Sequence, residues 1–179
     1  LRGGKQSSVK VVRGQNFGYH EVLNVDLASI VPRLRTEAAG RPFLLAGHSL
    51  GGQFALLYAS RHPGEVDAVV LLAGGSNYYG AMPSGKRLTR RLGLRTIRTI
   101  NQVLRFFPGD KLGFGGRQPF TMMQDWTEEA LTGKYRVTGD PTDYDHALGK
   151  LAIPVLMVSL EGDPLVPKCS ADYLAGKLE

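Results

Sequence analysis

The stretch Phe43-Leu44-Leu45-Ala46-Gly47-His48-Ser49-Leu50-Gly51-Gly52 decides the fold prediction, because it joins an apolar run to a G-x-S-x-G pattern. The apolar run is typical of a buried strand, and residues 53–60 have the composition of a helix. Ser49 is therefore expected on a sharp strand-to-helix turn that holds its hydroxyl in the open. This placement makes Ser49 a candidate nucleophile. The alternative is a serine that only caps the helix.

Glycines stand two residues before and two residues after this serine. We expect glycine at Gly47 and Gly51 because a side chain there would crowd the strained backbone of the turn. The turn also leaves the first N–H groups of the next helix without intrahelical partners. The N–H of Leu50 is thereby placed to bind a developing oxyanion. One peptide thus supplies a candidate nucleophile and half of an oxyanion hole.

Composition indicates an ordinary folded domain. The chain has 179 residues, 42% hydrophobic and 21% charged, which is enough for one core and too apolar for a disordered chain. No apolar run is long enough to span a membrane, and no signal peptide is visible. The single cysteine, Cys169, forms no internal disulfide, so a cytoplasmic location is the default expectation. The unusual start Leu1-Arg2-Gly3-Gly4 predicts that the chain is a piece of a longer protein.

Apolar runs and helical patterns alternate along the chain. Glycine and proline at His62-Pro63-Gly64 end the helix after Ser49, and Pro32 is expected to kink or split the helix before it. Strands joined by helices of this length indicate parallel βαβ units. The fold class is therefore α/β, with a mostly parallel sheet and helices on both faces. The expected strands are residues 8–13, 43–48, 66–73 and 153–160, and the other expected helices are residues 21–39 and a terminal one from about Ser170.

Residues 78–148 interrupt this alternation and are too long for a plain connection. We interpret them as a helical cap inserted into a core made of residues 1–77 and 149–179. Four large apolar side chains in the cap are candidates to line an acyl-sized pocket. They are Phe107, Met122, Met123 and Trp126.

A basic amphipathic helix, or two interrupted near Gly93, is expected within the cap. Residues 86–107 contain seven Lys and Arg residues and no acidic residue, which accounts for essentially all of the net charge of +6. The plain interpretation is a solvated helix face over the site. The alternative is attraction of acidic substrates or contact with an anionic membrane surface. No nucleic-acid motif accompanies the charge. The cations proposed for surface contact are Lys86, Arg87, Arg90 and Arg91, and the helical apolar positions are Leu88, Leu92, Ile97, Ile100 and Leu104.

A serine nucleophile needs a histidine to take its proton and a carboxylate to orient that histidine. Asp163 is the candidate carboxylate, because it follows a predicted strand and shares a sheet edge with Ser49. The alternative is that Asp163 only caps a turn, and Glu161 is the reserve candidate. No histidine follows Asp163. A structural or surface role is expected for each of the four histidines, His20, His48, His62 and His146.

Several segments together resemble the α/β-hydrolase fold superfamily. The resemblance spans most of the chain, and residues 106–113 resemble the cap of a bacterial group of predicted α/β-hydrolases. It implies that Ser49 is the nucleophile, Leu50 N–H an oxyanion donor and Asp163 the triad acid. It also implies that the last strand-helix unit, with the catalytic histidine, and the first strands lie outside this chain. The segments are Gly47 to Gly52, Arg61-His62-Pro63, Ala73-Gly74-Gly75, Ile153-Pro154-Val155-Leu156, residues 163–167 and Arg13-Gly14.

These observations predict a serine hydrolase that cleaves an ester, thioester or related acyl bond through an acyl-enzyme on Ser49. No cofactor and no metal are expected, and the partner is a small-molecule acyl substrate. Two alternatives remain open: a non-catalytic binding module with this fold, and an acyltransferase that uses the same serine. We expect little turnover from the 179-residue chain alone, because it lacks a histidine after Asp163.

Overall fold

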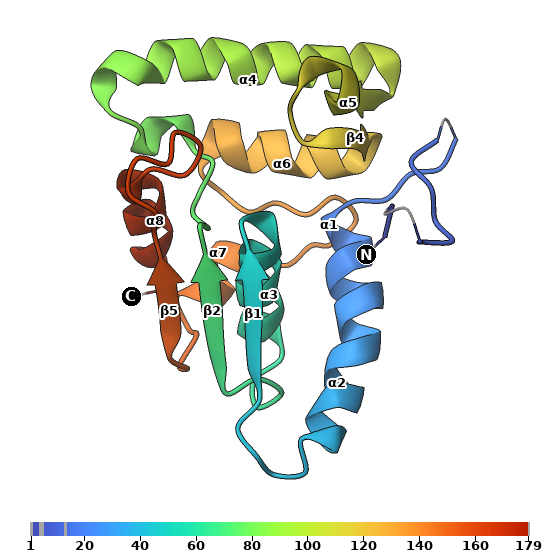
Figure 1. The fold of residues 1–179 in the computed structure, drawn as a ribbon, viewed down its shortest axis with the longest axis vertical. Helices are drawn as coiled ribbons and strands as arrows, with labels where there is room; N and C mark the ends of the chain where they lie inside the picture. The colour runs from blue at the N-terminus through green and yellow to red at the C-terminus, as the bar shows by residue number, and fades with distance from the viewer. Residues whose placement is uncertain (1, 4–5, 13, 179) are drawn as a thin grey trace.

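A three-stranded parallel sheet organises the computed structural model, which describes residues 2–3, 6–12 and 14–178. Its strands are β1 (Leu44–His48), β2 (Ala68–Leu72) and β5 (Val155–Val158), in the order β1-β2-β5. Leu72 pairs with His48 on one side and with Val158 on the other, so the three carboxyl ends lie at one edge (Figure 1). The parallel strands with their connecting helices confirm the α/β class.

Helix α3 (Leu50–Arg61) packs against β1 and β2 on one face of the sheet. Val69 and Leu71 of β2 are fully buried on this side. On the other face, Leu44, Leu72 and Leu156 are 51%, 43% and 58% exposed. The continuous aliphatic run of β2 therefore has only one of its faces buried among the described residues.

The strand expected at residues 8–13 is wrong for its described part, because residues 8–12 form a loop. A strand needs a neighbour that continues a ladder. Here the bonds are local ones, from Gln15 N–H to the Val12 carbonyl and from Lys10 N–H to the Gln15 side chain. Arg13 lies outside the described residues.

One helical run replaces the expected helix at residues 21–39. It consists of α1 (Tyr19–Glu21), a π-helical segment (Val22–Leu27) and α2 (Ala28–Glu37). The expected split at Pro32 is wrong, since the helix continues through it. The irregularity is the wider π turn one turn earlier, which is a recognised way for a helix to absorb a local mismatch.

A second layer lies across the carboxyl ends of the strands (Figure 1). It begins with a short 3-10 turn (Tyr79–Ala81) and contains the long helix α4 (Ser84–Leu104) and helix α6 (Phe120–Thr132). Helix α4 is continuous through Gly93, so of the two expected forms the single helix is the correct one. Between the two helices lie β3 (Phe106–Pro108), α5 (Gly109–Leu112) and β4 (Gly116–Pro119), a small antiparallel unit that the sequence reasoning did not predict.

The last helices return to the sheet. Helix α7 (Tyr144–Leu148) packs on α3, and α8 (Lys168–Ala175) follows β5. Tyr144 and Leu148 are completely buried in the main core. The division of the chain into a core and an inserted cap at residues 78–148 stays a prediction.

Candidate active site

Ser49 occupies the turn between β1 and α3 in a strained backbone conformation with positive φ, at φ 53° and ψ −123°. Its N–H donates to the Leu72 carbonyl at 2.9 Å, which ties the turn to the end of β2. Its hydroxyl makes no capping bond to the helix. The alternative of a helix-capping serine is therefore wrong, and the strained, half-buried residue lies at the edge of the sheet.

A second strained residue lies beside it. Ala73, directly after β2, has φ 46°, and its N–H donates to the Val158 carbonyl at 2.8 Å. A Cβ built on the next residue, Gly74, would lie 3.3 Å from the Ser49 carbonyl oxygen. Two adjacent strands thus end in non-glycine residues with positive φ at the same edge, a pattern that clusters at functional sites.

The glycines of the turn serve a close approach of backbone to backbone. A Cβ on Gly47 would lie 2.4 Å from the carbonyl atoms of Gly51 and from the nitrogen of Gly52. A Cβ on Gly52 would lie 2.8 Å from the Gly47 oxygen and from Leu71 Cγ. A Cβ on Gly51 would meet nothing within 4 Å, so the crowding expected there is wrong. The pair that needs glycine is Gly47 with Gly52.

The start of α3 offers N–H groups beside the serine. Gly52 N–H and Gln53 N–H donate back to the Ser49 carbonyl at 3.0 and 3.4 Å. In the described structure the N–H groups of Leu50 and Gly51 have no acceptor, as expected for the first turn of a helix. The Leu50 N–H adjoins Ser49 and is free to bind an oxyanion formed on a substrate at that hydroxyl.

Asp163 lies in the loop between β5 and α8, at the same edge of the sheet. Its Oδ1 accepts hydrogen bonds from Leu165 N–H at 2.8 Å and Val166 N–H at 3.1 Å, so the side chain does stabilise a turn. It also lines an open hollow of about 800 Å³ beside β5 and α8. Strands β1 and β5 are separated by β2, which sets the two strand ends about 10 Å apart. Glu161, the reserve candidate, lines the same hollow.

None of the four histidines has a hydrogen bond or ion pair with Ser49 or Asp163 in the described structure. His20 Nδ1 lies 3.0 Å from Asn24 Nδ2, and His62 stacks on Tyr58. His48 and His146 are exposed. The four side chains therefore have the structural or surface surroundings expected for them.

The proposed pocket residues are packed into the layer above the sheet. Phe107, Met122 and Met123 are 1%, 7% and 4% exposed, and Trp126 is half-buried. Trp126 and Phe107 both contact the ring of Phe114, at centroid distances of 5.6 and 6.3 Å. The 800 Å³ hollow and a smaller one of about 200 Å³ beside Asp125 are lined by other residues. A pocket formed by these four side chains stays a prediction.

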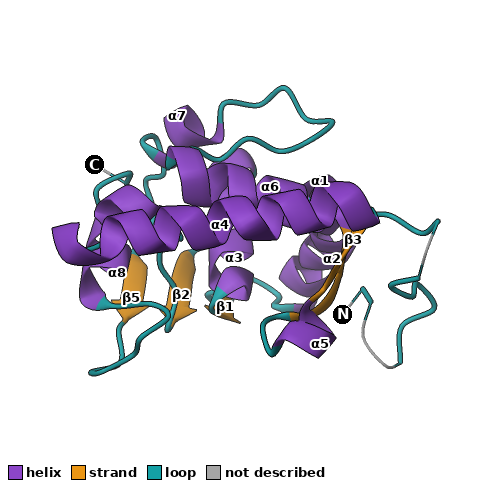
Figure 2. Ribbon diagram, turned by 90° about the horizontal axis from the view of Figure 1, so that it is seen from above, coloured by secondary structure: helices purple, strands orange, loops and turns teal. Residues whose placement is uncertain are grey.

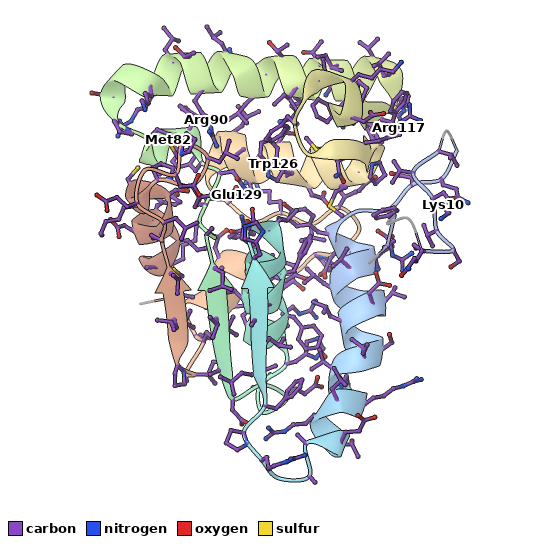
Figure 3. The ribbon with its side chains drawn as sticks, viewed as in Figure 1. Lys10, Met82, Arg90, Arg117, Trp126 and Glu129 are labelled. Atoms are coloured by element: carbon purple, nitrogen blue, oxygen red, sulfur yellow. The ribbon has the colours of Figure 1, made fainter. Side chains whose placement is uncertain are left out.

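A buried carboxylate joins the upper layer to the sheet edge. Glu129 of α6, which is fully buried, accepts hydrogen bonds from the Ser76 hydroxyl and, at 3.0 Å, from Asn77 N–H. Ser76 lies in the loop after β2, where its carbonyl accepts a bond from the Ser170 hydroxyl of α8. Figure 3 shows Glu129 between α6 and the top of β2, with Arg90 below α4 on the side facing the sheet.

Burial shifts the pKa values of both Glu129 and Arg90. Desolvation raises the pKa of Glu129, although the bonds from Ser76 and Asn77 oppose it. Desolvation also lowers the pKa of Arg90, and the charge of Glu129 partly offsets that effect. The Arg90 Nε atom is buried without a hydrogen-bond partner in the described structure. The two charges therefore lie close enough to interact without forming an ion pair.

Sequence reasoning missed Glu129 and the neighbouring buried acid Asp125, which binds Tyr19 N–H and Thr138. A signal for both was present. Positions 122, 125, 126 and 129 recur at three- and four-residue spacing, so a helix places these acids on the same face as Met122 and Trp126. An acid on an apolar helix face is a sign of a buried, hydrogen-bonded carboxylate.

Two other features are absent from the described part of the chain, a metal cluster and a membrane-spanning helix. No group of three or more His, Cys, Asp and Glu side chains is arranged to hold a metal ion. None of the described helices combines the length and apolar character that a membrane crossing requires.

Comparison with known proteins assigns the family. The model of the alpha/beta hydrolase fold family matches residues 1–179, and the chain belongs to this family. The monoacylglycerol lipase of Paleococcus ferrophilus is structurally similar, with a TM-score of 0.54 and 16% identity. A bacterial membrane phospholipase A, described as a virulence factor, gives a TM-score of 0.46 and 20% identity. A comparison with curated protein sequences gave no match.

The chain is shorter than both of these solved proteins. It aligns over 93% of its own length with the lipase and over 100% with the phospholipase, and it spans 63% and 58% of their lengths. At these identities the likeness to the lipase shows the fold. The activity of the whole protein is therefore a matter for proposal.

Proposed function

We propose that this protein is a serine hydrolase that cleaves an ester, thioester or related acyl bond through an acyl-enzyme on Ser49. The observation that carries the proposal is the strained, positive-φ conformation of Ser49 at the end of β1, with a hydroxyl that caps nothing. A structure holds such strain only where its surroundings enforce it, and here the close approach of Gly47 and Gly52 does so.

In this proposal the Ser49 Oγ attacks the acyl carbon while a general base takes its proton. The Leu50 N–H, free of any acceptor in the described residues, donates to the oxyanion of the tetrahedral intermediate. The oxyanion collapses to an acyl-Ser49 ester and releases the alcohol or thiol with one proton. Water then attacks the acyl-Ser49 ester, the acyl group leaves as a carboxylic acid, and Ser49 regains its hydroxyl. This chemistry needs neither a metal nor a cofactor.

Asp163 is the proposed acid that orients the base. Only its Oδ1 atom is used by the turn at Leu165 and Val166, and the side chain borders an open hollow. Its second oxygen is therefore available to accept a hydrogen bond from a histidine.

A non-catalytic binding module is the second candidate, because none of the four histidines bonds to Ser49 or Asp163 in the described structure. For the same reason we expect little turnover from the 179-residue chain by itself. An acyltransferase would use the same residues with an acceptor other than water.

A fluorophosphonate probe tests the proposal, because it reacts with activated serines. The full-length protein should be labelled, and mass spectrometry should place the label on Ser49. Ser49→Ala should abolish labelling, whereas Ser60→Ala, which removes a hydroxyl bonded to the Leu57 carbonyl on α3, should leave it unchanged. Absence of labelling in folded, full-length wild type would refute the hydrolase proposal and favour the binding module.

A further inference from the structure

The outer side of α4 carries an apolar stripe that covers nothing in the described structure. Leu88, Leu92 and Val103 are 67%, 53% and 74% exposed. Their spacing of four and eleven residues places them on one line along the helix. Leu94 and Asn101, on the other side of the same helix, are 3% and 1% exposed. The helical spacing of Leu88 and Leu92 left open which side of the helix meets the core, and the structure turns both side chains outward.

Exposed cations flank this stripe. Arg91 and Arg95 are exposed beside the stripe, and residues 86–107 contain no acid that could neutralise them locally. Arg91 also lies over the ring of Tyr79. Lys86 and Arg87 are directed elsewhere, since Lys86 lines the hollow beside β5 and α8 and Arg87 Nε donates to the Met82 carbonyl at 2.7 Å. Arg98 differs, because it is paired with Glu128 at 3.1 Å. The outward face of α4 therefore combines three aliphatic side chains with two cations.

We propose that this face of α4 docks on an anionic lipid membrane surface. A helix with an apolar stripe beside Lys and Arg lies in the plane of a lipid interface, with the stripe among the acyl chains and the cations at the headgroups. Two other occupants fit less well. A nucleic acid would leave the three exposed aliphatic side chains without an apolar partner. A second copy would bring two equally charged faces together.

The position of the helix supports this docking mode. Helix α4 is the outermost element above the carboxyl ends of the strands (Figure 1), and it lies in front of the other elements when the molecule is seen from above (Figure 2). A membrane on this side would meet the stripe before any part of the sheet. The edge of the sheet that carries Ser49 then faces the lipid. The inference concerns binding and does not depend on the reactivity of Ser49.

Co-sedimentation with vesicles tests the proposal. The protein should bind equimolar phosphatidylglycerol and phosphatidylcholine vesicles, and pure phosphatidylcholine vesicles far more weakly. The triple variant Leu88→Ser, Leu92→Ser, Val103→Ser should lower the partition coefficient at least about 100-fold, or about fivefold for each side chain, since each loses part of its transfer into lipid. Arg91→Gln with Arg95→Gln should lower it about 25-fold, or about fivefold for each cation.

Matched controls separate this face from general effects of charge and exposure. Ile30→Ser with Leu34→Ser removes two exposed aliphatic side chains from α2, and Arg33→Gln with Lys150→Gln removes two exposed cations elsewhere. Both controls should change partitioning by less than about threefold. Circular dichroism checks that every variant is folded.

Three results would overturn the proposal. One is equal binding to neutral and anionic vesicles, and another is a triple variant that partitions like wild type. The third is a dimer of the wild type without lipid, seen by sedimentation velocity, together with a monomeric triple variant. The stripe would then bind a second copy of the chain.

Discussion

The close approach at the Ser49 turn makes a quantitative prediction about two glycines that look equivalent in the G-x-S-x-G pattern. Gly47→Ala places a Cβ 2.4 Å from the backbone of Gly51 and Gly52. Ordinary carbon contacts are about 3.5 to 4.0 Å, so the strand end and the helix start must separate by about 1 Å. Backbone cannot rotate aside as a side chain does. We therefore expect a loss of about 3 kcal/mol in the free energy of unfolding, the upper end for overpacking.

Gly51→Ala should behave in the opposite way. Its Cβ meets nothing within 4 Å, and the position is the second residue of α3. Alanine is favoured over glycine in helices by about 0.5 to 1 kcal/mol, so stability should be unchanged or slightly raised. The two variants should differ by about 3 to 4 kcal/mol, which for a chain of this size is roughly 10 °C in the unfolding midpoint.

Urea unfolding followed by far-ultraviolet circular dichroism measures both values, and Gly52→Ala provides a third point. Its Cβ would lie 2.8 Å from the Gly47 oxygen and Leu71 Cγ, so it should fall between the other two. If Gly51→Ala costs as much as Gly47→Ala, the close approach does not explain the glycines and this reasoning is refuted.

Two acids with shifted pKa values, Glu129 and Asp140, give the remaining predictions, with opposite pH dependence. Desolvation raises the folded-state pKa of Glu129 above its ordinary value of 4.5, so wild-type stability should fall as pH rises from about 4.5 through that raised pKa. Glu129→Gln should flatten this slope in urea unfolding at a series of pH values, and an unchanged slope would contradict the assignment. Burial alone would raise the pKa of Asp140, but hydrogen bonds from Thr142, Asn24 and Tyr144 hold it well below its ordinary value of 3.8. Asp140 therefore contributes stability above that ordinary value that is lost as pH falls through the folded-state pKa, and Asp140→Asn should cost about 2 to 3 kcal/mol at pH 7 and progressively less in acid. A cost for Asp140→Asn that does not change with pH would argue against this role.

Local sequence was informative wherever a single element carries its own pattern. The apolar run ending at Gly47 gave β1, and the glycine and proline after His62 marked the end of α3. The same local signals place Ser49 at the turn, because strand and helix meet there within two residues. Asp163 likewise follows from the β5 pattern and the rule that parallel strands share a carboxyl edge.

Local sequence misled where an element's state depends on a partner. Residues 8–12 have a strand-like composition but lack the ladder that would make them one. In α4, the helical spacing of the apolar positions Leu88 and Leu92 left the buried side open, and packing against α6 selected Leu94 and Asn101. A helical repeat fixes which residues share a side. It does not fix which side meets the core.

The sequence by itself determined that this chain folds as an α/β protein with a serine at a strand-to-helix turn, because strand runs, helix ends and turn glycines act over a few residues. Only the tertiary structure decided that Gly52 rather than Gly51 approaches Gly47, and that Glu129 joins the upper layer to the loop after β2. It also decided that α4 turns outward an apolar stripe flanked by cations. Each of these depends on contacts between segments distant in sequence or on the path of the backbone through the turn. Such contacts follow from packing, which no local pattern encodes.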